Sequence, residues 1–290
     1  MSFESTLTVR VRRWRDRAFL ALSLLCLALS LVALAALVGD LASNGLPRID
    51  RAFLTSFPSR FASEAGLLAA WVGSLFVILV TAALAIPIGI AAGVYLEEDA
   101  PKNLWTNSLE VAMANLAGVP SIVFGLMALG LFVYRFGLGQ SVLTAGLTLG
   151  LLVLPIVVVA TRESLRAIPG YIREASFAVG GSKWQTIRHH VLPYSTGGIL
   201  TGVIVAVSRA LGETAPLVTV GALTFITFLP TSVMDPFTVL PIQMFNWVSR
   251  PQEDFHANAA AAGVLLLLLT LSLNGVALCL RYRSRKRVHW

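Results

Sequence analysis

An arginine and a glutamate stand four residues apart inside a long apolar stretch of the chain. Arg209 lies near the middle of the segment 197–221, and Glu213 follows about one helical turn later. On a helix both side chains would share one face, close to the middle of a membrane. A charge at that depth is costly, so such residues normally face a protein interior or a transport pathway. Because a guanidinium offers a planar fork of donors to an oxyanion, the pair indicates either an anion pathway or an ion pair that holds a helix bundle together.

Two neighbouring features bear on this chemistry. Pro216 has no amide hydrogen and leaves the carbonyl of Gly212 without its helical partner, so we expect the helix to bend beside the pair. Arg162 and Glu163, at the inner end of the segment 141–161, are a second candidate pair on a pathway. An arginine at the inner edge of a span also follows from the general distribution of positive charge in membrane proteins, so this second pair has a purely topological alternative.

Membrane helices must position these residues. The 290 residues are 56% hydrophobic and 13% charged, well below the roughly 25% charged residues of a soluble domain. The first apolar run is too long for the core of a signal peptide, so we expect it to remain as a span. We predict an all-α polytopic membrane protein with six transmembrane helices, at 19–38, 67–95, 107–134, 141–161, 197–221 and 257–280.

The positive charges predict how these spans are oriented. Of the 22 Lys and Arg residues, 16 fall in segments that six spans place in the cytoplasm and 5 in segments placed outside, with Arg209 in the membrane. The expected organisation is a cytoplasmic segment 1–18, a transmembrane domain 19–281 and a basic cytoplasmic tail 282–290, in the inner cell membrane and in contact with its lipids. The acidic run 97–99 is cytoplasmic by the parity of the spans alone. Because the basic residues flank spans and do not gather on one face, we expect no nucleic acid as a partner.

Other features of the spans and loops leave alternatives open. Pro87, Pro120 and Pro155 each lie inside a span, where a proline predicts an interrupted helix lining a cavity or a simple kink. The long outer segment 222–256 contains Trp247 and several phenylalanines. Such aromatic residues are typical of a belt at the membrane interface, with the docking of a partner as the alternative.

The cytoplasmic segment 162–195 carries a recognisable motif. It contains Glu174-Ala175-Ser176, then Gly180 after three further residues, and later Leu192-Pro193. This pattern resembles the EAA loop of ABC importer permeases, with Ser176 in place of a second alanine and His190 in place of an isoleucine. Pro169-Gly170 is suited to open a short helix there, and Gly180-Gly181 allows the sharp turn that ends it.

The resemblance implies that this helix docks on an ATP-binding subunit and passes its motion to the spans. The residues implied in this coupling are Glu174, Ala175, Gly180, Gly181, Leu192 and Pro193. The alternative is an amphipathic helix on the membrane surface, which Arg173, Lys183 and Trp184 would favour.

Three further stretches, 118–125, 208–217 and 241–247, resemble permeases of phosphate ABC importers, of the PstA type. The resemblance covers nearly everything after the first span and implies the type I ABC importer permease fold. It also implies three kinds of partner: a second permease of the PstC type, two ATP-binding subunits and a periplasmic phosphate-binding protein.

We expect no cofactor and no metal on this chain. None of its three lysines follows a glycine as in a Walker loop, so ATP and Mg are expected on the partner subunit. Cys26 and Cys279 lack metal-ligand spacing and are expected to be packing residues. The four histidines, at 189, 190, 256 and 289, lie outside the spans, which disfavours a membrane enzyme, and the tails are too short for the signalling domain of a sensor. Molybdate or sulfate remain alternative substrates, because permeases for these anions share the EAA loop.

Overall fold

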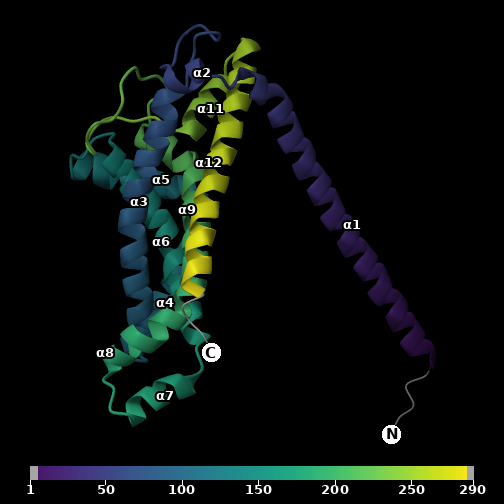
Figure 1. Ribbon diagram of the computed structural model, residues 1–290, viewed down its shortest axis with the longest axis vertical. Helices are drawn as coiled ribbons and strands as arrows, with labels where there is room; N and C mark the ends of the chain where they lie inside the picture. Colours follow the sequence, from purple (N-terminus) through teal and green to yellow (C-terminus); the bar gives the residue numbers. More distant parts are fainter. Residues whose placement is uncertain (1–5, 286–290) are drawn as a thin grey trace.

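The long helices of the protein form a bundle from which one helix diverges (Figure 1). The computed structural model describes residues 6–285, and in this range the chain is helical without strands. The packed helices are α3 (Leu68–Val94), α6 (Val142–Arg166), α9 (Leu192–Gly212) and α12 (Asp254–Arg285). The diverging helix is α1 (Thr6–Gly45), which touches α12 near its own C-terminal end and is exposed over residues 12–37.

Shorter elements connect these helices. The short α-helices are α2 (Arg51–Thr55), α4 (Leu104–Leu116), α5 (Ser121–Ala128), α7 (Gly170–Ala178), α8 (Lys183–Thr186), α10 (Ala215–Val220) and α11 (Leu240–Val248). Wider π-helical turns follow α3, α5 and α8, at Tyr95–Asp99, Leu129–Arg135 and Ile187–Val191. The helices α7 and α8 lie at one end of the bundle, the α7 end, and α2 lies at the opposite end, the α2 end (Figure 1).

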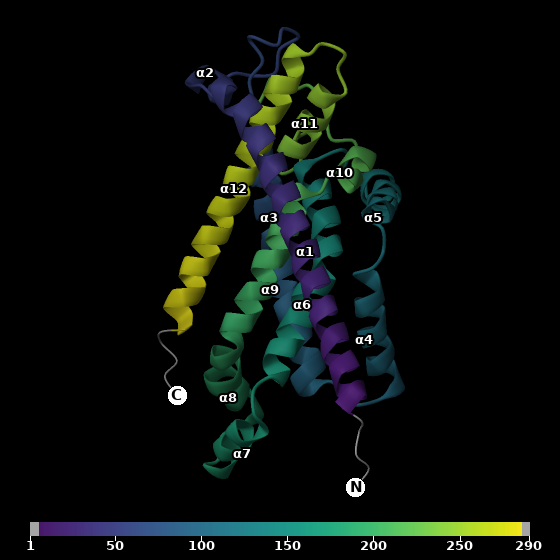
Figure 2. The ribbon, with the colours of Figure 1, turned by 90° about the vertical axis from the view of Figure 1, so that its right-hand side faces the viewer.

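The arrangement is that of a multi-pass membrane protein. Within the described residues, five helices are long and apolar enough to cross a membrane, and a sixth crossing results if the bent pair 104–116 and 121–135 is one span. The start of α1 and the end of α12 both point toward the α7 end, as an even number of crossings requires (Figures 1 and 2). Residues 1–5 of the predicted N-terminal segment and 286–290 of the predicted tail lie outside the described residues.

Small residues bring the central helices together. Within α3, a side chain at Gly93 would place its first carbon 2.6 Å from Cβ of Thr161 on α6. Within α9, a side chain at Gly198 would place its first carbon 2.9 Å from Cβ of Ser164 on α6. In a membrane, where lipid is as apolar as the protein core, such close backbone approach supplies much of the packing energy between helices. Cys26 and Cys279 are exposed instead, so the expectation that they pack in the core was wrong.

The three prolines of the spans behave differently. Pro87 and Pro155 lie inside α3 and α6, which continue through them as single helices. At Pro120 the chain breaks, and the helices before and after the break are bent by 105°. Figure 2 shows α4 running along the bundle and α5 seen end-on beside it. The interrupted-helix prediction therefore holds for Pro120 alone of the three.

The long segment between α10 and α12 contains a helix, α11, that the sequence did not reveal. Trp247 on α11 is fully buried, with its ring centroid 5.9 Å from that of Phe53 and 6.4 Å from that of Phe255. With its amide oriented to satisfy both groups, Gln243 accepts from Trp247 Nε1 and donates to the carbonyl of Thr224, each at 3.0 Å. The expectation of an aromatic belt was therefore wrong for Trp247, which belongs to the core at the α2 end.

Replacing Trp247 by Ala is expected to destabilise the protein by about 3–5 kcal/mol, because the change leaves a cavity and unpairs Gln243. Thermal unfolding in detergent measures the effect. Phe245→Ala is the matched control, since this side chain on the same helix is 58% exposed and should change the unfolding temperature little. Equal losses in the two variants would show that Trp247 does not anchor the core.

Candidate functional site

The paired Arg209 and Glu213 lie at the point where α9 ends. Arg209 Nε is 3.4 Å from Glu213 Oε1, so the spacing-based prediction of a pair is met in the structure. The arginine side chain is 40% exposed on the surface of the chain and the glutamate 16%. Among the described residues no hydrogen bond to the two Nη groups of Arg209 is found, so both are open to an anion.

The helix break beside this pair follows from local chemistry. α9 ends at Gly212, Glu213 has extended backbone with φ −72° and ψ 131°, and α10 begins at Ala215 with Pro216 in its first turn. Because Pro216 cannot donate to the carbonyl of Gly212, the helix stops there and does not merely bend. Glu213 thus stands just beyond the end of the helix, and its carboxylate still contacts Arg209 from there.

An apolar hollow flanks the break. It has a volume of about 660 Å³ and lies between α5, α10, α11 and α12. Its polar lining side chains are the threonines at 214 and 219, and none of its lining residues is charged. A dehydrated oxyanion would gain little from such a lining, so Arg209 is the candidate anion-binding group beside the break.

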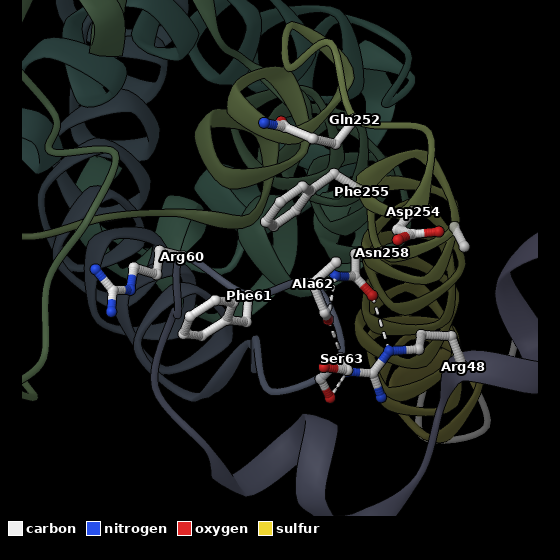
Figure 3. Close-up of a pocket in the computed structure, with 10 residues that line it drawn as sticks. Arg48, Arg60, Phe61, Ala62, Ser63, Gln252, Asp254, Phe255 and Asn258 are labelled. Atoms are coloured by element: carbon white, nitrogen blue, oxygen red, sulfur yellow. Dashed lines mark hydrogen bonds between the residues drawn. The ribbon is translucent and has the colours of Figure 1, made fainter.

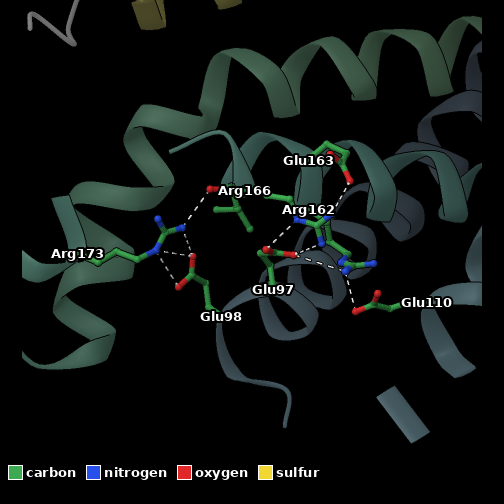
Figure 4. Close-up of polar contacts among 8 residues, drawn as sticks. Glu97, Glu98, Glu110, Arg162, Glu163, Arg166 and Arg173 are labelled. Atoms are coloured by element: carbon green, nitrogen blue, oxygen red, sulfur yellow. Dashed lines mark hydrogen bonds and ion pairs between the residues drawn. The ribbon is translucent and has the colours of Figure 1, made fainter. Parts of the chain in front are cut away.

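Arg162 and Glu163 do not form the pair that their adjacency suggested. Successive residues of a helix point about 100° apart, so the two side chains leave α6 in different directions. Arg162 is buried and its Nη2 lies 2.7 Å from Glu110 of α4 and 3.5 Å from Glu97 (Figure 4). Glu163 is exposed and contacts Arg166 at 3.3 Å. The predicted pair is therefore corrected: Arg162 and Glu163 make no contact with each other, although both belong to one network of ion pairs through Glu97 and Arg166.

The coupling motif folds as a helix, a turn and a second short helix. α7 starts after Pro169 and is followed by Gly180, whose φ of +83° is of the kind that glycine favours. Ser176 is buried and shares a hydrogen bond of 2.8 Å with Thr186 Oγ1 of α8. A side chain at Gly181 would lie 2.7 Å from Ser176 Oγ, which explains why the motif needs small residues here.

The remaining motif residues lie on or near the surface of the α7 end. Glu174 and Ala175 are exposed on α7, and Leu192 and Pro193 begin α9 and are half-buried. His190, which replaces the isoleucine of the pattern, is exposed. The motif therefore presents a surface at the α7 end rather than filling the core.

Two cations of this segment point toward the bundle and not toward lipid headgroups. Arg173 Nη2 donates to Glu98 Oε1 at 2.6 Å, and Lys183 Nζ lies 2.8 Å from Asp99 Oδ1. These two cations were among the residues that favoured the alternative of a helix lying on the membrane surface, and in the structure both pair with carboxylates of the chain. Their carboxylate partners, with Glu97 and Glu110, are residues that sequence reasoning did not assign to a site. The sequence did contain a signal for these contacts: the three consecutive acidic residues 97–99 and the basic segment 162–195 are both predicted to be cytoplasmic.

A second polar cluster lies at the α2 end of the bundle, around Arg48. Arg48 Nε donates to Asn258 Oδ1 at 2.8 Å, and Arg48 Nη2 donates to three carbonyls of the loop after α2 (Figure 3). The cluster borders a pocket of about 710 Å³ that is also lined by Arg60 and Asp254. Because the hydrogen bonds of Arg48 are directed at the protein, its role is to hold this loop against α12.

The chain is similar to known membrane transport components. Residues 85–288 match the model of a family described as binding-protein-dependent transport system inner membrane component. A phosphate transport system permease protein PstA of Xylella fastidiosa (strain Temecula1) is 32% identical, covering 97% of this chain and 98% of that protein. A probable ABC transporter permease protein, YqgI of Bacillus subtilis (strain 168), is 28% identical over 90% of this chain and 94% of that protein.

Solved structures share the architecture. A bacterial ABC transporter that imports the acidic polysaccharide alginate matches with a TM-score of 0.65 and 13% identity, over 94% of this chain and 99% of that chain. The inward-facing methionine ABC transporter MetNI matches with a TM-score of 0.59 and 18% identity, over 73% and 93%. At these identities the likeness shows the fold alone, and that fold is the one predicted, of type I ABC importer permeases.

Proposed function

Since the chain belongs to the family of binding-protein-dependent transport system inner membrane components, we propose that it is the permease subunit of an ATP-driven importer for inorganic phosphate. The observation that carries the proposal is Arg209, paired with Glu213 at a helix break, in a chain that resembles phosphate transport permeases along almost its whole length. The pair opens to let the guanidinium fork meet phosphate oxygens and closes again when the anion leaves. The chain is a transport subunit and not an enzyme, as its relatives are permease proteins.

The proposed orientation places the α7 end in the cytoplasm. It is supported by the excess of Lys and Arg in the segments predicted to be there. The segment 162–195 then presents Glu174, Ala175 and Gly180 to an ATP-binding subunit, which binds ATP and Mg. The complete importer contains a second permease of the PstC type, two ATP-binding subunits and a periplasmic phosphate-binding protein.

Uptake of radiolabelled phosphate by the reconstituted complex tests the proposal. With its binding protein outside and ATP inside, the vesicles should accumulate phosphate, and excess molybdate or sulfate should not compete. Vesicles that lack the binding protein are the control for leakage. ATP-driven uptake of molybdate or sulfate without uptake of phosphate would assign the permease to another oxyanion.

A further inference from the structure

Three consecutive carboxylates connect the end of α3 to the coupling segment. Glu97, Glu98 and Asp99, here called the acidic triplet, form the last part of the π-helical turn after α3. Each contacts at least one cation from the segment 162–195 (Figure 4 draws the first two). The two runs of chain are about 70 residues apart, so only the fold brings these charges together.

The contact between Glu98 and Arg173 is short and well sheltered. The glutamate side chain is 9% exposed and the arginine 22%, and Arg173 Nε and Nη2 both donate to the carboxylate. Arg173 also donates to the carbonyls of Leu165 and Ile168, at 3.1 and 2.9 Å. One guanidinium therefore joins α7, the end of α6 and the turn after α3. Charge-assisted, forked hydrogen bonds of this kind hold their partners at a defined distance and angle.

Glu97 extends the connection to α4. Its carboxylate accepts from Nε and Nη2 of Arg166, at 3.3 and 3.1 Å, and contacts Arg162 at 3.5 Å. Arg162 in turn contacts Glu110 of α4 at 2.7 Å (Figure 4). The charges thus connect α7 to α4 through two groups of ion pairs, which meet at the adjacent residues Glu97 and Glu98.

The broken span leads from there to the anion-binding arginine. α4 continues through the break at Pro120 into α5, and α5 packs against α10. At this packing a side chain on Gly125 would lie 2.6 Å from the Cα of Pro216, so the two backbones are in direct contact. Pro216 follows Glu213 by three residues. A displacement of α4 would therefore reach the Arg209–Glu213 pair through contiguous elements.

We propose that Glu97 and Glu98 of the acidic triplet are the joint through which the movement of α7 reaches the membrane helices. Glu98 ties α7 to the end of α3, and Glu97 with Arg162 carries the movement to α4 and so to the helix break beside Arg209. Glu97 and Glu98 are in this sense positioning residues for transport, acting through Arg162, Arg166 and Arg173. The inference rests on the proposed function and deepens it.

The test compares Glu98→Gln with Asp99→Asn in the reconstituted importer. Glu98→Gln keeps the side-chain shape but removes the charge that holds Arg173. At equal amounts of assembled complex, ATP hydrolysis without binding protein should be unchanged, while phosphate transported per ATP should fall about tenfold. Asp99→Asn is the matched control, because this neighbouring pair with Lys183 is about half exposed and a surface pair contributes little.

A second variant decides the outcome if Glu98→Gln does not assemble. In Glu97→Gln both arginines keep another carboxylate, Arg166 with Glu163 and Arg162 with Glu110, so the chain should fold. Transport per ATP should again fall, by about fivefold. If every variant that assembles transported as much phosphate per ATP as the wild type, the proposed coupling role would be wrong and these ion pairs would be structural only. If the wild-type complex did not take up phosphate, the proposed substrate would be wrong. The proposed joint could still be tested in that case, because the Glu97 and Glu98 variants would lose the stimulation of ATP hydrolysis by the binding protein.

Discussion

Replacing Arg209 by Gln is expected to lower phosphate uptake by about 100-fold or more at normal amounts of assembled complex. Each hydrogen bond to a charged group contributes about 1.5–3 kcal/mol, and the guanidinium fork offers two to the anion. The Nη groups that would make them face no acceptor among the described residues of this chain. The apolar hollow beside the break contains no charged group that could replace the arginine. Uptake of radiolabelled phosphate per complex is the measurement.

Two further variants separate an anion contact from a structural ion pair. Arg209→Gln together with Glu213→Gln removes both charges and nearly keeps the shape of the site, so it should restore assembly but not uptake. Arg209→Lys keeps the positive charge and loses the planar fork, so its uptake should lie between that of the wild type and that of Arg209→Gln. Near-normal uptake in the double variant would exclude the pathway role and leave an ion pair that only holds the bundle.

Gly180→Val is expected to separate ATP hydrolysis from transport. At a φ of +83° a β-branched residue is strained by about 1–3 kcal/mol, although space for the side chain is open. The turn would relax by rotating toward negative φ and would shift α7 relative to α8. The helix that is proposed to dock on the ATP-binding subunit would then be misplaced, and stimulation of ATP hydrolysis by the binding protein should fall about tenfold.

The control for backbone strain is Gly139→Val. Gly139 has a φ of +64°, also with open space around it, but it lies just before α6 at the α2 end. The strain is similar and the distance from the coupling segment is large, so uptake and ATP hydrolysis should remain coupled. If Gly180→Val left uptake and stimulated hydrolysis as in the wild type, the assignment of the coupling turn would be wrong.

Local patterns in the sequence were sufficient for the helical architecture. A span must contain about 20 apolar residues because the bilayer is about 30 Å thick, and this length is visible in the composition of each segment. The Pro-Gly and Gly-Gly pairs of the coupling segment act through their own backbone, so the limits of α7 could be predicted. The pairing of Arg209 with Glu213 was predictable for the same reason, since only four residues separate them, although Glu213 lies just beyond the end of α9.

Tertiary contacts decided which proline breaks its helix. Pro87 and Pro155 remain within α3 and α6, two helices that pack along most of their length and hold each other straight. Pro120 breaks its helix, and the segment after it turns across the bundle, where Gly125 meets Pro216. Propensity is similar at the three prolines, so the packing available on each side determines the outcome.

Ion pairing and burial also depended on the fold. Neighbours in sequence suggested that Arg162 meets Glu163, but a helix directs them apart, and the partners Glu97 and Glu110 arrive from other elements. The ring of Trp247 would suit a membrane interface or a protein core, and the residue type does not decide between them. In the structure it is buried in the core beside Phe53 and Phe255. The sequence by itself determined which segments are helical and which residues share a turn, because these follow from interactions within a few residues. The tertiary structure alone decided which distant groups meet, because charge and hydrophobicity have no preferred partner until the fold brings one within contact distance.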